Sequence, residues 1–272
     1  MDVRRPALAA LLGAGVLGLL GGAAAGGRGL LDRQAATART LIGKPLGEQA
    51  LAADRTWRKK RGDRLELVVL GDSIAAGLGA ERPRDTLGAR LARKLAKRTG
   101  RAVRLRTAAV VGSESSALAA QLAALPAAYR PDLAVVVVGG NDVTHRVPVA
   151  TSVAHLVACV AELQRRGAHV VVGTCPDLGV LRPVPQPLRT LAGRASRQLA
   201  LAQARAVLPL GASVVSLSDA VGDHFRRDPD LMFSLDGFHP SSLGYRHAAR
   251  ALLPRLVDAV TGTGQLPLTT TS

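Results

Sequence analysis

Aromatic residues make up only 2% of this chain of 272 residues. Proteins that bind single-stranded nucleic acid stack bases on aromatic side chains, so this scarcity argues against that class. The two cysteines, Cys159 and Cys175, are too few for a disulfide framework, and no C-x-x-C or Cys/His cluster has the spacing of a zinc site. Because the first is expected within a helix and the second just after a strand, we expect both thiols to be free.

Acidic residues are scarce relative to basic ones: 20 Asp and Glu stand against 36 Lys and Arg, which gives a formal net charge of +16. Ten of the basic residues lie in 81–106, where the only acidic residues are Glu81 and Asp85. This basic cluster could bind an anionic membrane surface or nucleic acid. No helix-turn-helix, RNA-binding or P-loop signature accompanies it. We therefore expect no nucleic acid partner, and the alternative to membrane binding is a solvated helix face.

Charge is also absent from residues 6–27, which follow Arg4 and Arg5. This pattern fits a secretory signal with a small-residue cleavage site at Ala23-Ala24-Ala25, and the segment is also long enough to span a bilayer. The basic residues that follow it are typical of a cytoplasmic side. We interpret 1–27 as a signal peptide or transmembrane anchor and expect an exported protein, either secreted or membrane-anchored. A cytoplasm-facing anchor is the alternative.

Apolar residues make up 47% of the chain, enough for a buried core. We interpret 28–64 as a basic connector that is partly helical, 65–259 as one domain, and 260–272 as a flexible tail. Apolar runs predict strands at 65–70, 103–109, 133–139, 169–174 and 213–217. Helical patterns lie at 86–98, 115–124, 151–166, 188–207 and 241–259. This alternation predicts an α/β fold of three layers, with a five-stranded parallel sheet covered by helices on both faces.

Polar motifs follow the predicted strands, at the sheet edge where such folds place their sites. Gly71-Asp72-Ser73 follows the first strand, and a glycine turn there would expose Ser73 for attack on a carbonyl carbon. The alternative is a serine that only caps a helix. Before the last helix, Asp236 precedes His239 by three residues, and a histidine that acts as general base needs a carboxylate to orient it. A surface loop is the alternative for this pair.

Two other strand ends carry possible hydrogen-bond donors for an oxyanion. Asn141, in Gly139-Gly140-Asn141-Asp142, has a side-chain amide, although an Asx-turn would use the same residue types. Gly112 follows the second strand and lets its backbone N–H approach a substrate closely. Alone, Gly112 would be read as an ordinary loop glycine.

Together these motifs resemble those of the SGNH/GDSL hydrolase family. GDS at 71–73, Gly112, GGND at 139–142 and DGFHP at 236–240 stand in the family's order and spacing, and the resemblance covers 65–259. It implies a flavodoxin-like sheet. Members often carry Asn and a second Gly around the Gly112 motif, where this chain has Thr107 and Ser113.

The resemblance also implies the roles of the site residues. Ser73 would be the nucleophile and His239 the base, which Asp236 would orient. The oxyanion hole would be formed by the amides of Ser73 and Gly112 and by the side chain of Asn141. No metal and no organic cofactor is needed for such acyl transfer.

We therefore expect a serine esterase or lipase that hydrolyses carboxylic (acyl) esters. Alternatives within this chemistry are a carbohydrate O-acetylesterase and an acyltransferase, and an alternative of another class is a basic membrane- or nucleic-acid-binding protein without turnover. The loop 174–189 should wall one side of the site. Because it is apolar, proline-rich and without aromatics, it favours acyl or lipid esters over polysaccharide acetates. We expect a monomer acting on a small-molecule or lipid ester.

Overall fold

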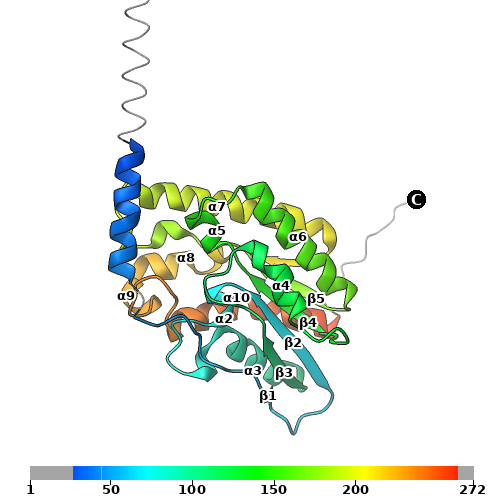
Figure 1. Cartoon of the computed structure of the whole chain (residues 1–272). Helices are drawn as coiled ribbons and strands as arrows, with labels where there is room; N and C mark the ends of the chain where they lie inside the picture. The colour runs from blue at the N-terminus through cyan, green and yellow to red at the C-terminus, as the bar shows by residue number, and fades with distance from the viewer. Residues whose placement is uncertain (1–26, 44, 263–272) are drawn as a thin grey trace, which may run out of the picture.

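The computed structural model describes residues 27–43 and 45–262, and Figure 1 shows their arrangement. The apolar segment 6–27 lies outside the described part except for Gly27, as does the expected tail beyond residue 262. Within the described residues, no helix is long and apolar enough to cross a membrane. Residues 27–42, in the stretch interpreted as a connector, form a helix.

The centre of the fold is one sheet with the strand order β1-β3-β2-β4-β5-β6. Its strands are β1 (Thr56–Trp57), β2 (Arg64–Gly71), β3 (Ala102–Thr107), β4 (Leu133–Val137), β5 (His169–Gly173) and β6 (Ser213–Val215). β2 to β6 pair in parallel and correspond to the five strands predicted from the sequence. When these five strands are numbered 1 to 5 along the chain, from β2 to β6, their order in the sheet is 2-1-3-4-5. This is the flavodoxin-like pattern, so the α/β fold class is confirmed.

The sheet has one more strand than expected, because β1 adds an antiparallel edge to β3. Thr56 pairs with Arg104 and Trp57 with Val103. Burial of the indole explains this extra strand: Trp57 is only 7% exposed and packs into the main core. The basic residues around it had suggested a connector alone, and the single tryptophan was the signal for a packed segment.

Helices cover both faces of the sheet. They are α2 (Ser73–Ala76), α3 (Leu87–Thr99), α4 (Leu118–Ala123), α5 (Gly140–Thr144), α6 (Val149–Arg165), α7 (Leu188–Val207), α8 (Leu217–Arg227), α9 (Pro229–Met232) and α10 (Ser242–Thr261). Single 3₁₀ turns lie at Pro83–Asp85, Ser115–Ala117, Leu178–Val180 and Leu208–Leu210. The sequence predicted α3, α4, α6, α7 and α10 within a few residues of these bounds.

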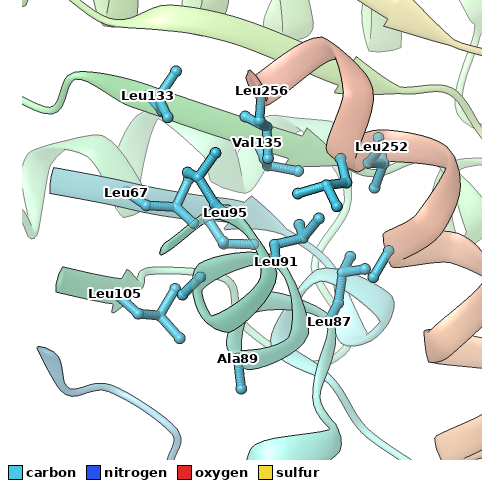
Figure 2. Close-up of a cluster of buried hydrophobic side chains, with 14 of the residues drawn as sticks. Leu67, Leu87, Ala89, Leu91, Leu95, Leu105, Leu133, Val135, Leu252 and Leu256 are labelled. Atoms are coloured by element: carbon cyan, nitrogen blue, oxygen red, sulfur yellow. The ribbon is translucent and has the colours of Figure 1, made fainter. Parts of the chain in front are cut away.

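One core layer lies between the sheet and the pair α3 and α10. Figure 2 shows Leu91 and Leu95 of α3 and Leu252 of α10 packed over Leu67 and Val135 of the strands. The opposite layer holds α4 and α6 against side chains from the other face of the same strands. Near-continuous apolar strands are typical of a sheet buried on both faces, and every residue of β4 is buried. The carboxyl ends of the strands are left for the site.

Candidate active site

The turn after β2 is fixed by a glycine with no room for a side chain. Gly71 has φ +132°, and a Cβ atom on it would lie 1.8 Å from the carbonyl oxygen of Val137. Asp72 then caps α2 by accepting a hydrogen bond of 2.9 Å from the backbone N–H of Ile74. Ser73 is therefore held as the first residue of α2, at the carboxyl edge of the sheet.

A buried glutamine holds the same turn from the other side. The side-chain oxygen of Gln121 accepts from the backbone N–H of Gly71 at 2.9 Å, and its amide nitrogen donates to the carbonyl of Gly71 at 2.8 Å. Gln121 lies in α4 and is 4% exposed. The sequence does not indicate the role of Gln121, because a lone glutamine in a helical pattern carries no signal of its partner 50 residues away.

The structure brings Ser73, His239 and Asp236 together in one hydrogen-bonded line. The Nε2 atom of His239 lies 2.9 Å from the hydroxyl oxygen of Ser73. The Nδ1 atom lies 2.6 Å from Oδ2 of Asp236. These are the distances of a nucleophile, a base within reach of its proton, and a carboxylate that orients the base. These residues come from two separate turns, and 166 positions in the sequence separate Ser73 from His239.

The second carboxylate oxygen of Asp236 is also fully used. Oδ1 accepts from the hydroxyl of Ser234 at 3.0 Å and from the backbone N–H groups of Phe238 and His239 at 2.9 Å each. Burial by itself raises the pKa of Asp236, but hydrogen bonds from the ring and backbone of His239 and from the backbone of Phe238 outweigh it, and the net pKa is lowered. Asp236 therefore stays ionised beside the imidazole.

Of the three expected oxyanion donors, Ser73 and Asn141 line the pocket and Gly112 does not. Asn141, in α5, lines the same pocket as Ser73, and its side-chain amide donates to the carbonyl of Ser113 at 2.9 Å. An asparagine amide has a second N–H, which this contact leaves available. Gly112 lies in the loop after β3 with φ +81°, is exposed, and is not among the residues that line the pocket. Its role, like that of Asn141, stays a prediction.

The aspartate beside Asn141 anchors the loop that carries Gly112. Asp142 is 1% exposed and accepts from the backbone N–H of Ser115 at 3.0 and 3.2 Å. The hydroxyl of Ser152 donates to it at 2.5 Å. In the GGND motif, the candidate donor Asn141 is thus followed by a structural residue, Asp142. The sequence shows the motif but does not indicate the partners of Asp142.

A narrow, mostly apolar pocket of about 70 Å³ opens beside Ser73. Pro176, Leu178, Val180 and Leu181 line it, which confirms that the loop 174–189 walls the site. The loop itself has no aromatic residue, as the sequence shows, but other segments bring aromatic rings to the pocket. All three phenylalanines of the chain line this pocket: Phe225, Phe233 and Phe238.

One carboxylate in the pocket wall ties the loop to the helices. Asp177 is 8% exposed and accepts from the backbone N–H of Gly179 at 2.8 Å. Arg197 of α7 contacts it at 3.1 Å and Arg226 of α8 at 3.5 Å. Because two arginines and a backbone N–H surround this carboxylate, we read it as a fixed corner of the pocket wall.

Known proteins match both the sequence and the fold. The model of the GDSL-like lipase/acylhydrolase family matches residues 69–247. GDSL-like esterase Rv1075c of Mycobacterium tuberculosis (strain ATCC 25618 / H37Rv) is 40% identical over 269 residues, which cover 95% of this chain and 86% of that protein.

Solved structures agree at lower identity. A lipase/acylhydrolase from Enterococcus faecalis has a TM-score of 0.57 at 20% identity, over 73% of this chain and 96% of its own. Axe2, an acetylxylan esterase from Geobacillus stearothermophilus, has a TM-score of 0.55 at 20% identity, over 72% and 94%. These matches show the fold, while the family match and the 40% relative show descent. The chain belongs to the GDSL-like lipase/acylhydrolase family and is an ester hydrolase.

Proposed function

We propose that Ser73 is the nucleophile of this hydrolase, with His239 as its general base and Asp236 as the group that orients the base. The observation that carries this assignment is the unbroken line of hydrogen bonds from Ser73 through His239 to Asp236, at the edge of the pocket. A nucleophile and base within hydrogen-bond reach, with the base oriented by a third group, is the arrangement that activates a serine.

The reaction proceeds in two acyl transfers. The Ser73 oxygen attacks the ester carbonyl carbon while His239 takes the hydroxyl proton at Nε2. His239 then gives that proton to the leaving alcohol as the ester C–O bond breaks. Water then attacks the acyl-serine while His239 takes a proton from it. His239 returns that proton to the Ser73 oxygen as the carboxylic acid leaves. The ionised Asp236 stabilises the imidazolium that forms in both steps.

The negative charge on the carbonyl oxygen needs hydrogen-bond donors. We assign the second amide N–H of Asn141 and the backbone N–H groups of Ser73 and Gly112 to this oxyanion. Asn141 is the member of the set that shares the pocket lining with Ser73. Loss of one such donor typically costs about 100- to 1000-fold in kcat.

For the substrate we propose carboxylic esters with an apolar acyl chain, including lipid esters. Aliphatic side chains and the three phenylalanines line the pocket, and its carboxylate at Asp177 already has partners. A sugar acetate would need polar groups for its hydroxyls. A carbohydrate O-acetylesterase is the second candidate, favoured by the structural likeness to an acetylxylan esterase and by rings on which a sugar can stack.

We further propose that the protein is exported and acts as a monomer on esters at or near a lipid surface. The apolar segment 6–27 supports export by a cleaved signal or an anchor. The helix over 27–42 follows this segment directly and packs near the pocket walls. An uncleaved anchor would therefore keep the pocket close to the bilayer.

The assignment is tested by turnover of p-nitrophenyl acetate and octanoate. Ser73→Ala and His239→Ala should each remove nearly all activity, and the double variant should be little worse, because residues that act as one unit are non-additive. Asp236→Asn should lose less. The matched control is Ser116→Ala, an exposed serine in the Ser115–Ala117 turn, which should keep full activity.

A serine-directed organophosphonate should label Ser73 alone, and the label should be absent from Ser73→Ala. Most of the activity surviving in Ser73→Ala would reject the mechanism. Addition of a short alcohol separates hydrolysis from transfer, since a transferase would release a new ester in place of the free acid. Faster release of acetate from acetylated xylan than from octanoate esters would favour the second candidate.

A further inference from the structure

The helix over 27–42 lies before residue 69, where the family match begins, yet it is packed onto the domain. One stripe of it is buried or half-buried, at Leu31, Gln34, Ala35, Ala38 and Ile42. These positions follow the spacing of a single helix face. Figure 1 shows this helix in dark blue, beside the end of the fold that carries α8 and α9.

The helix contacts three separate segments around the pocket. Asp32 forms an ion pair of 3.2 Å with Arg146, which follows α5. The side-chain oxygen of Gln34 accepts from the backbone N–H of Leu188 at 3.1 Å, and its amide nitrogen donates to the carbonyl of Gln186. Both of those partners belong to the end of the loop 174–189 and the start of α7.

The third contact is apolar. Ala38 is 6% exposed and belongs to one hydrophobic cluster with Leu178, Leu181, Phe225 and Phe233. Those four side chains also line the pocket, whereas Ala38 does not. The helix thus packs behind the pocket walls, on the loop side and on the side of α8 and α9 together.

We propose that helix 27–42 holds these two walls in position and thereby sets the selectivity of the enzyme for acyl chain length. The proposal rests on the proposed function, in which Ser73 attacks an acyl ester. The acyl carbons nearest Ser73 contact the residues around the GDS turn, so an acetyl group does not depend on the helix. A longer chain must fill the space between Leu178, Leu181 and the phenylalanines, so its binding depends on the separation of the walls.

Two chemically different variants test this in the full chain. Ala38→Asp places a charge in the apolar cluster, and its matched control Ala36→Asp places the same charge on the exposed face of the same helix. Gln34→Ala removes both hydrogen bonds to the loop, and its control is the exposed neighbour Arg33→Ala. The readout is kcat/KM for p-nitrophenyl acetate and p-nitrophenyl octanoate.

We expect Ala38→Asp and Gln34→Ala to lower the ratio of octanoate to acetate kcat/KM by about tenfold, the scale of losing one or two methylene contacts in an apolar pocket. Acetate turnover should stay within about twofold, and both control variants should keep the ratio of the unmodified protein. If Ala38→Asp does not fold, Gln34→Ala and Arg33→Ala decide the question.

An unchanged ratio in Gln34→Ala would overturn the proposal. So would an equal loss for both esters, since that would make the helix a general stabiliser of the fold. These outcomes are distinct from failure of the proposed function, which would appear as turnover of both esters by Ser73→Ala.

Discussion

Asp72, which precedes the nucleophile, is a carboxylate with an environment unlike that of Asp236. It is 2% exposed, and burial is the main cause that raises its pKa from 3.8 to about 6. Hydrogen bonds from the backbone of Ile74 and Gly139 and the nearby His239 oppose that shift only in part. The cap of α2 is therefore a group that changes charge just below neutral pH.

This raised pKa makes stability depend on pH with a definite sign. As pH falls from 7 to 5, the folded state takes up a proton at Asp72 while the unfolded state, with its pKa near 3.8, does not, so this group adds stability. From the two pKa values we expect a gain of about 1 kcal/mol over that interval. Urea unfolding of the unmodified protein and of Asp72→Asn at both pH values measures it.

The unmodified protein should gain relative to Asp72→Asn as the pH falls, because the amide cannot take up this proton. The comparison removes the contributions of all other titrating groups that the two proteins share. A difference that stays constant between pH 7 and pH 5, or that reverses, would contradict a raised pKa at Asp72.

At the scale of elements, α10 is tied to the turn after α2 by a single buried hydroxyl. Tyr245 is fully buried, and its hydroxyl donates to the carbonyl of Leu78 at 2.7 Å. Leu78 accepts at its oxygen while its own N–H donates to the carbonyl of Ser73. The tyrosine thus connects the segment that carries Ser73 with the helix that begins after His239.

Removal of that hydroxyl leaves a buried carbonyl without its partner. We expect Tyr245→Phe to lower the free energy of unfolding by about 1–3 kcal/mol. The chain's other tyrosine is the control: the hydroxyl of Tyr129 is buried and, within the described residues, has no hydrogen-bond partner. Tyr129→Phe should be neutral or stabilising. Equal losses in the two variants, measured by urea unfolding, would refute the tether.

Sequence patterns predicted the parallel strands and the long helices because each has a clear apolar period or a continuous Val/Leu run. They missed α8, since the predicted strand 213–217 ran into its first residue. The sequence does carry a start signal for this helix, because serine is a preferred N-cap residue and Ser216 precedes α8. In the structure, the hydroxyl of Ser216 accepts from the backbone N–H of Asp219. Without α8, the sequence prediction lacked part of the pocket wall, because α8 supplies Val221 and Phe225 to the pocket.

The site residues divide in the same way. Ser73, Asp236 and His239 stand in short motifs, so the sequence indicated them, and the structure places them within hydrogen-bond distance. Gln121 and Asp177 act through partners that are distant in the sequence, and only the fold identifies those partners. Gly112 stands in a motif, but it is exposed and lies outside the lining of the pocket.

At the scale of the whole molecule, part of the basic cluster lies near the amino ends of the parallel strands, whereas Ser73 follows the carboxyl end of β2. Lys97 and Arg98 end α3, which leads into the start of β3, and Ala102 there pairs with Arg64 at the start of β2. Ser73 follows the other end of β2, which is eight residues long. At about 3.3 Å a residue, these two ends of the strand are about 23 Å apart.

A basic groove lies near the ends of α3 and α10. Its lining is Lys94, Lys97, Arg98, Arg250, Leu253, Pro254, Val257 and Asp258. Partial burial and then the nearby Arg250 and Arg90 lower the pKa of the Lys94 ammonium group, so these cations repel one another. An anionic surface would relieve that repulsion.

We expect the protein to bind anionic vesicles more strongly than neutral ones, and to lose that preference at about 0.5 M salt, where screening is strong. Each Lys or Arg near such a surface contributes on the order of 1 kcal/mol. Replacement of Lys94, Lys97 and Arg98 by Gln should weaken the preference, while Ser73→Ala should not. Equal sedimentation with both vesicle types would show that these cations only keep the protein in solution.

The described part of the chain begins at residue 27 and ends at residue 262, and the places of these two residues matter for attaching the enzyme to a solid support. Residues 27–42 pack beside the pocket, whereas α10 ends near the basic groove, at the far edge of the sheet. A linkage made at residue 27 would hold the pocket close to the support and restrict the approach of bulky esters. A linkage made at residue 262 would present the pocket to the solution, so the choice between these two positions by itself should alter the apparent substrate range.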